Sequence, residues 1–244
     1  MKPDWLTFVD GKRRYSLLRI LSELSRLQDK ENLNFILIGA LPLLLSDYLH
    51  YTALWDIDLL FRNEREMNKF TQASKTQQLR IVDYDDALTS NENIASFHSA
   101  WTFDKQWFNV DYILKADLFE FLADDLTSSP LFHDQAHWQD TDHMISLYQA
   151  HPWDIIVSKV ISPRTARDIS LRVNMSIDIR HIFAVYGAER DNELFWHHII
   201  SRALFFCPRS VFASKFLELL RAAPELGYEG VTISPSAAQA LEQQ

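Results

Sequence analysis

Three aspartates and a glycine are the residues of this sequence whose types and spacing could do chemistry. Asp56 and Asp58 stand two residues apart in the run Asp-Ile-Asp-Leu-Leu-Phe, and Asp111 lies between apolar residues in Phe-Asn-Val-Asp-Tyr-Ile-Leu. Side chains alternate along a strand, so Asp56 and Asp58 share one face, about 6–7 Å apart. Carboxylates in apolar surroundings are costly to bury unless a positive group offsets them, and a divalent metal is the usual group. The aspartates therefore predict a metal site.

A glycine turn precedes the first two aspartates and could bind phosphate. Phe35–Ile38 is a short apolar run of the kind found in buried strands, and Gly39 closes it. Apolar residues then follow at helical spacing from Leu41 to Leu49, so a helix is expected to start just after the glycine. The free N–H groups at a helix start favour anions. Acidic residues on adjacent strands below such a turn would hold Mg²⁺ and a triphosphate together; the alternative is that they merely face water at strand ends.

The order of these residues resembles the signature of the nucleotidyltransferase superfamily, whose core is shared with DNA polymerase beta. The segments Ile-Gly-Ala-Leu-Pro-Leu-Leu-Leu and Trp-Asp-Ile-Asp-Leu-Leu are most similar to minimal bacterial nucleotidyltransferases, including the AbiEii-like toxins of toxin–antitoxin pairs. The resemblance covers roughly residues 30 to 115. The family usually has Gly-Ser or Gly-Gly where this chain has Gly39-Ala40, so a hydroxyl that would touch the phosphates is missing.

The resemblance implies transfer of a nucleoside monophosphate from a nucleoside triphosphate to a hydroxyl acceptor, with Mg²⁺ as cofactor. It implies that Asp56, Asp58 and Asp111 are the catalytic and metal-binding residues, and that the amides of Gly39 and Ala40 receive the phosphates. The acceptor is left open and could be tRNA, a protein or a small molecule. The toxin branch of the family implies an antitoxin partner.

Two basic residues are further candidates for nucleotide binding. Arg62 stands just beyond the aspartates, and Lys159 resembles a lysine on the helix that follows the catalytic core in the AbiEii-like group. For each of them an ordinary surface position is the alternative. Three histidines, His133, His137 and His143, are spaced too loosely for a tight zinc motif and have no cysteine near them.

Periodicity predicts an α+β protein, with a nucleotidyltransferase-like mixed β-sheet flanked by helices and then a helical bundle. The runs 95–103 and 106–114 alternate on both sides of Asp104-Lys105, which predicts a hairpin that puts Asp111 in a central strand. Thr127-Ser-Ser-Pro130 is the clearest break in the chain. We therefore expect a catalytic core over residues 1–130 and a helical domain over 131–244, in which 142–150 and 153–161 are helices.

Bulk composition narrows the class of protein. The chain has 244 residues, of which 47% are hydrophobic, so it can form one large core or two small ones. A formal net charge of −9 argues against a protein that wraps nucleic acid by charge alone. The single Cys207 excludes an internal disulfide framework. With no signal-like start and no apolar run long enough for a membrane span, we expect a cytoplasmic protein without membrane contact.

Two other functions remain open at this point. The chain could be a binding or regulatory protein that kept the nucleotidyltransferase fold and lost the reaction, in a toxin–antitoxin type pair, and Ala40 favours this. It could also be an unrelated α+β protein whose three aspartates only cap strands. A structure with Asp111 far from Asp56 would favour the second alternative.

Overall fold

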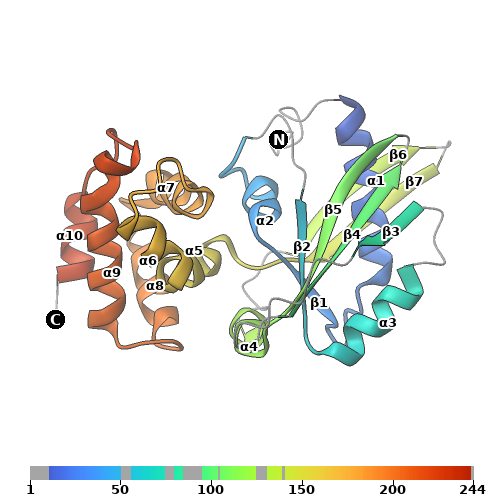
Figure 1. The fold of residues 1–244 in the computed structure, drawn as a ribbon, viewed down its shortest axis with the longest axis horizontal. Coiled ribbons are helices and arrows are strands. Elements are labelled where there is room, and N and C mark those ends of the chain that lie inside the picture. Colours follow the sequence, from blue (N-terminus) through green and yellow to red (C-terminus); the bar gives the residue numbers. More distant parts are fainter. Residues whose placement is uncertain are drawn as a thin grey trace. The chain divides into compact units, whose positions relative to one another are not determined.

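The chain folds into two compact units, Met1–His151 and Pro152–Gln244. The computed structural model describes residues 11–50, 56–74, 80–84, 95–103, 105–124, 131–138 and 141–242. The first unit combines helices with β-strands, and in the second every element is helical (Figure 1). The predicted α+β class, a mixed sheet with helices followed by a helical region, is therefore confirmed.

The first unit is organised around a mixed sheet. In chain order, its elements are α1 (Gly11–Leu27), β1 (Phe35–Ile38), α2 (Ala40–Leu45), β2 (Asp56–Phe61), α3 (Glu64–Ser74), β3 (Arg80–Tyr84), β4 (Ala95–Phe103), β5 (Gln106–Leu114), α4 (Ala116–Asp124), β6 (Leu131–Trp138) and β7 (Thr141–Tyr148). The described strands of the main sheet have the order β1-β2-β5-β4-β3. Strands β2 and β5 run parallel, and the other neighbouring pairs are antiparallel.

One face of this sheet carries the hydrophobic core of the unit. Alternate residues of β2, namely Ile57, Leu59 and Phe61, are fully buried and pack in the same cluster as Leu17 and Leu21 of α1. Helices α1 and α3 contact the sheet (Figure 1). Because strand side chains alternate, the intervening residues of β2, including both aspartates, are directed to the opposite face.

The predicted hairpin is present with the predicted bounds. Strand β4 pairs with β5 so that Phe103 lies opposite Gln106, which leaves two residues of the chain between the strands. Lys105 has φ 62°, the left-handed conformation that tight hairpin turns require. This turn sets the register of the whole pair, which decides the neighbours of Asp111.

The predicted helix over Asp142–Ala150 is wrong, and this moves the boundary between the units. The segment forms β7, which pairs with β6 as a separate two-stranded sheet. Ile145 and Leu147 alternate into the core beside α1, and the Ser25 hydroxyl donates to the Ser146 carbonyl at 2.9 Å. The hairpin therefore belongs to the first unit, which ends at His151 instead of at residue 130 as predicted. The Thr127-Ser-Ser-Pro130 break lies outside the described residues.

The second unit is a set of packed helices, and it holds no net charge. Its elements are α5 (Pro152–Ile161), α6 (Pro163–Ser170), α7 (Ile177–Glu189), α8 (Glu193–Ala203), α9 (Arg209–Ala222), the short 3-10 helix η1 (Ala223–Leu226) and α10 (Pro235–Glu242).

Residues 152–244 contain ten Lys or Arg and ten Asp or Glu, so the formal charge of −9 resides in the first unit. Among the described residues no helix combines the length and the apolar character that a membrane crossing requires.

A buried ion pair ties α5 to α8 inside the second unit. Asp154 is fully buried, and one of its oxygens lies 2.8 Å from His198 Nε2. Arg202 donates to both carboxylate oxygens, at 3.2 and 3.1 Å. A fully buried carboxylate needs such partners, so Asp154 is part of the packing between these helices.

Candidate active site

The sheet brings two of the three predicted acidic residues into direct register. Strands β2 and β5 are parallel neighbours, and Asp58 is the partner of Asp111 in their ladder. Adjacent strands lie about 4.8 Å apart, and directly paired residues direct their side chains to the same face. A distant Asp111 would have favoured an unrelated protein whose aspartates only cap strands, and this pairing shows that Asp111 is not distant.

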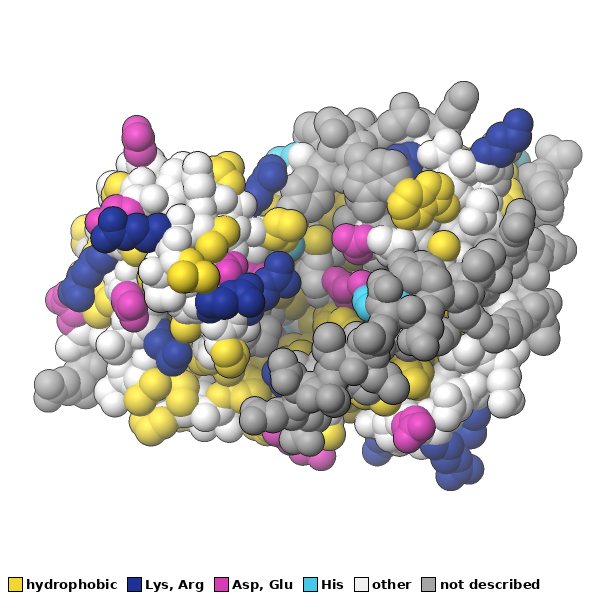
Figure 2. Space-filling view, in the orientation of Figure 1, with side chains coloured by type: hydrophobic (Ala, Val, Ile, Leu, Met, Phe, Trp, Pro, Cys, Tyr) yellow, Lys and Arg dark blue, Asp and Glu magenta, His cyan; other side chains and the backbone are white. Residues whose placement is uncertain are grey.

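Asp56 lies one step further along the same face. Its ladder partner is Asn109, whose side-chain amide donates to Asp56 Oδ1 at 2.9 Å. Asp56 is exposed, whereas Asp58 and Asp111 are half-buried. The site thus has an open end at Asp56 and a more enclosed end at the Asp58–Asp111 pair. Figure 2 shows acidic side chains and histidine atoms at the surface over this part of the sheet.

Gly39 touches the Asp58 carboxylate in a way that only glycine allows. It follows β1, whose last residue, Ile38, is the ladder partner of Asp58. Gly39 has φ 76° and ψ −139°, close to a region open essentially to glycine alone. A Cβ at this position would lie 1.9 Å from Asp58 Oδ2. The glycine is therefore required both by the backbone conformation and by the space that the carboxylate fills.

The predicted helix after Gly39 is present but short. Helix α2 begins at Ala40, and Gly39 as its N-cap makes no side-chain hydrogen bond. Its residues from Leu41 to Leu45 are buried, which anchors the turn against the core. Ala40 brings no hydroxyl to this place, so the backbone amides are the groups of this turn that could meet a phosphate.

His98 of β4 is the next residue across the sheet after Asp58 and Asp111. It lies on β4 opposite Asp111, and its Nδ1 is 2.8 Å from Asp111 Oδ1. The row therefore runs Ile38, Asp58, Asp111 and His98 over β1, β2, β5 and β4. Sequence reasoning missed His98. Counting outward from the two-residue turn at Asp104-Lys105 would have found it, since that turn pairs residue 98 with residue 111.

The acidic pair of Asp58 and Asp111 suits a magnesium ion. Hard carboxylate oxygens are the ligands that Mg²⁺ prefers, and proteins usually supply one or two of them, while substrate phosphates and water supply the rest. Asp58 and Asp111 meet this requirement as a pair. Within the described ranges no group of three or more His, Cys, Asp or Glu side chains is arranged as a metal site. The residues fit an ion shared with a phosphate ligand, and they do not form a closed protein cage.

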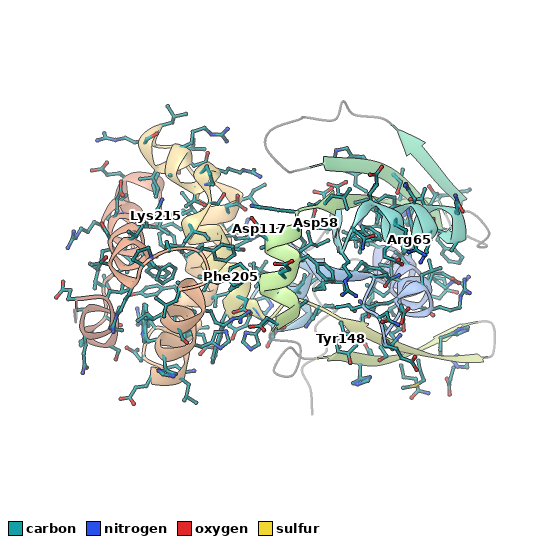
Figure 3. All side chains as sticks on the ribbon, turned by 90° about the horizontal axis from the view of Figure 1, so that it is seen from below. Asp58, Arg65, Asp117, Tyr148, Phe205 and Lys215 are labelled. Carbon is teal, nitrogen blue, oxygen red and sulfur yellow. The ribbon has the colours of Figure 1, made fainter. Side chains whose placement is uncertain are left out.

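Arg62 does not join the aspartates. It follows the last residue of β2, four positions beyond Asp58, which corresponds to about 13 Å along an extended strand. Its backbone N–H donates to the Asn34 carbonyl at 3.0 Å, and its side chain is exposed. Figure 3 shows Arg65, at the start of the following helix, well away from Asp58. The structure thus separates Arg62 from the acidic pair with which it was grouped.

Lys159 lies in the second unit and is held by an acidic partner. Its ammonium group is hydrogen-bonded to Asp178 of α7, and Arg164 Nε lies 3.3 Å from the other oxygen of the same carboxylate. Burial raises the pKa of Asp178, but Lys159 and Arg164 outweigh that effect and lower it. Lys159 is therefore neither an ordinary exposed lysine nor a cation without a counter-charge.

The buried His181, which senses the charge of Lys159, makes the stability of this helical unit depend on pH. Burial first, and then the charge of Lys159, lower the pKa of His181 to about 3. An unfolded histidine titrates near 6.5, so below that pH the unfolded chain gains a proton that the folded chain refuses until about pH 3. Stability is thus full above pH 6.5, and we expect the free energy of unfolding to fall by about 1.4 kcal/mol per pH unit within this window.

Urea unfolding measured between pH 7 and pH 4 checks this expectation. The variant His181→Leu should flatten the profile over this range, since it removes the group that titrates. His197→Leu is the matched control, because His197 is exposed on α8 of the same unit. An equally steep profile for the wild type and His181→Leu would contradict the expected titration.

Comparisons with known proteins find similarity to solved structures alone. No protein-family model matches the chain, and no curated protein matches its sequence. Among solved structures it resembles a proposed nucleotidyltransferase from H. pylori, with TM-score 0.40 and 12% identity over 96% of this chain and 92% of that chain. It also resembles JHP933 from Helicobacter pylori, with TM-score 0.41 and 12% identity over 96% and 89% of the two chains.

A third solved structure is also similar to this chain. An antigenic nucleotidyltransferase-like protein from Paracoccidioides brasiliensis gives a TM-score of 0.35 and 15% identity, over 80% of this chain and 95% of that chain. At these identities and scores, the likenesses establish neither a family nor an activity. A function has to be argued from the side chains of the site.

Proposed function

We propose that the chain is a Mg²⁺-dependent nucleotidyltransferase, which moves a nucleoside monophosphate from a nucleoside triphosphate to a hydroxyl acceptor. The observation that carries the proposal is the pairing of Asp58 with Asp111 on parallel neighbouring strands beside Gly39. Two carboxylates one strand spacing apart repel each other by roughly 3 kcal/mol at an effective dielectric constant of about 20. A divalent cation removes this repulsion, and the half-buried position of both groups strengthens their attraction for it.

The chain's own residues would perform the reaction by positioning and charge. Bound Mg²⁺ supplies Lewis-acid stabilisation of the triphosphate and of the leaving pyrophosphate. Asp58 and Asp111 would hold it, and Asp56 would add negative charge at the open end. The acceptor oxygen bonds to the α-phosphorus while the bond to the bridging α–β oxygen breaks, and pyrophosphate leaves. Asp111 is the group that would receive the hydroxyl proton, so most of the catalysis is electrostatic.

Three other residues have proposed roles in nucleotide binding. The amides of Gly39 and Ala40 would meet the β- and γ-phosphates, which the uncapped start of α2 supports. The resemblance of its helix to the AbiEii-like group supports a role for Lys159 in nucleotide binding, and its ammonium group is hydrogen-bonded to Asp178. Arg62 is left out of this set because of its distance along β2.

Within this proposed activity, the more specific function is that of an AbiEii-like toxin that works with an antitoxin. Its support is the sequence of the glycine turn and of the Asp56–Asp58 strand. The acceptor would then be tRNA, a protein or a small molecule. An acidic first unit favours a protein or small molecule over a large nucleic acid, unless the arginines of residues 164–180 contact the phosphates.

A catalytically inactive relative is the second candidate, and two observations favour it. Ala40 offers no hydroxyl to a phosphate, and Lys159 is already hydrogen-bonded to Asp178. A protein of this kind would keep the fold as a binding or regulatory partner in a toxin–antitoxin type pair. It would bind nucleotide weakly or not at all, and it would transfer nothing.

Nucleotide binding and transfer decide between these candidates. We expect calorimetry to show binding of at least one of the four nucleoside triphosphates in the presence of Mg²⁺ and its loss in the presence of EDTA. Incubation with each α-labelled triphosphate and a cell lysate should then label an acceptor. Binding without labelling would favour the inactive candidate, and a failure to bind any triphosphate with Mg²⁺ present would overturn the enzymatic proposal.

A further inference from the structure

The imidazole of His98 contacts the acidic pair at one defined point. Its Nδ1 lies 2.8 Å from Asp111 Oδ1, and the side chains of His98 and Asp111 are 23% and 22% exposed. An ionised carboxylate can only accept a hydrogen bond, so Nδ1 must carry the proton and donate it to Asp111. The bond engages one oxygen of Asp111, and Asp111 Oδ2 is the oxygen that could face an ion held together with Asp58.

The backbone leaves His98 and Asp111 little freedom to separate. They are direct partners in the β4–β5 ladder, whose pairing continues to Phe103 and Gln106. Val110 and Tyr112, on either side of Asp111, are fully buried against the core and hold β5 in place. Without the imidazole, the Asp111 carboxylate could rotate away from Asp58, because the two carboxylates repel each other.

We propose that His98 is a positioning residue of the metal site, which fixes the Asp111 carboxylate so that Oδ2 is directed toward the cation shared with Asp58. The proposal rests on the proposed function, because it takes Asp58 and Asp111 as the ion's ligands. Hydrogen-bond partners of ligating carboxylates typically contribute tenfold to hundredfold to metal affinity. Asn109 stands in the same relation to Asp56, at the exposed end of the site.

The chain offers a matched pair for comparison. His137 Nδ1 lies 2.8 Å from Asp142 Oδ1, the same atoms at the same distance, on the β6–β7 hairpin. Those side chains are 64% and 59% exposed, so solvent competes for the bond. In the β6–β7 ladder the partner of Asp142 is His137 and not a second carboxylate. A variant of His137 therefore controls for the loss of a histidine–aspartate bond as such.

Mn²⁺ alone is the probe, with its affinity followed by electron paramagnetic resonance. We expect His98→Leu to weaken Mn²⁺ binding by about tenfold to hundredfold. His98→Asn, which is smaller but retains a donor near the position of Nδ1, should stay within about threefold of the wild type. His137→Leu should leave Mn²⁺ affinity unchanged. Equal affinity for His98→Leu and the wild type, or equal losses for Leu and Asn, would overturn the positioning role.

A measurement on the wild-type protein keeps the test independent of how the variants fold. Substoichiometric Mn²⁺ should broaden the ring signals of His98 in the NMR spectrum and spare those of His137. Unbroadened His98 signals at concentrations where Mn²⁺ binds would overturn the inference. Wild-type protein that binds Mn²⁺ and broadens His98 but transfers no nucleotide would remove the enzymatic function alone and leave the positioning role standing.

Discussion

Replacing Asp58 with asparagine should abolish nucleotidyl transfer, with a rate loss of at least about 10³-fold and no loss of fold. Asp58 is the ladder partner of Asp111 and the neighbour of Gly39, so it is the most central ligand of the proposed site. The amide keeps the shape but removes the charge, and a loss of about 4 kcal/mol in transition-state stabilisation corresponds to this factor. The measurement is transfer of the α-labelled nucleotide at saturating Mg²⁺.

The folded state should tolerate this change. Asp58 is only half-buried, and its neutralisation relieves repulsion with Asp111, so the thermal midpoint should be unchanged or slightly higher. Asp142→Asn is the control, because Asp142 is an exposed aspartate of the same unit outside the main sheet. Full transfer activity in a folded Asp58→Asn protein would remove the metal site from the mechanism.

Replacing Gly39 with alanine should disable the site and also destabilise the first unit. The added Cβ would lie 1.9 Å from Asp58 Oδ2, so the carboxylate must move. The residue would also have to hold φ 76°, which costs a non-glycine residue about 1 to 3 kcal/mol. We expect transfer to fall by at least about 10²-fold and the thermal midpoint to drop by several degrees.

Gly187→Ala is the matched control for this substitution. Gly187 lies within α7 of the second unit, and nothing lies within 4 Å of the Cβ that alanine would add. Alanine there should stabilise the helix by about 0.5 to 1 kcal/mol, because glycine is a poor helix former. If both glycine variants were equally active and stable, the close approach of Gly39 to Asp58 would not matter for activity or stability.

The parts of the site that depend on local pattern could be predicted from the sequence. Alternation in two short apolar runs placed Asp58 and Asp111 on neighbouring strands, and the turn at Asp104-Lys105 predicted the hairpin with its observed bounds. The glycine turn was expected as well. The contact between Gly39 and the Asp58 carboxylate could not be predicted, because the distance between them depends on how β1 and β2 pair.

Contacts that depend on packing between distant elements could not be predicted. Lys159 was placed on the correct helix, but its bond to Asp178 depends on how α5 packs on α7. The helix predicted over Asp142–Ala150 is wrong because the apolar residues there fit both a helical and an alternating pattern over such a short length. Only the buried surface of α1, which covers Ile145 and Leu147, decides between the two.

The β6–β7 hairpin determines where the chain can be cut. A truncated protein that ends at residue 130 would leave in water the part of α1 that contacts β7. It would also free the Leu37 carbonyl at the β1 edge, which accepts from the Ala150 N–H at 2.8 Å. Unpaired strand edges beside exposed apolar surface promote aggregation. A soluble version of the sheet unit therefore has to continue to His151.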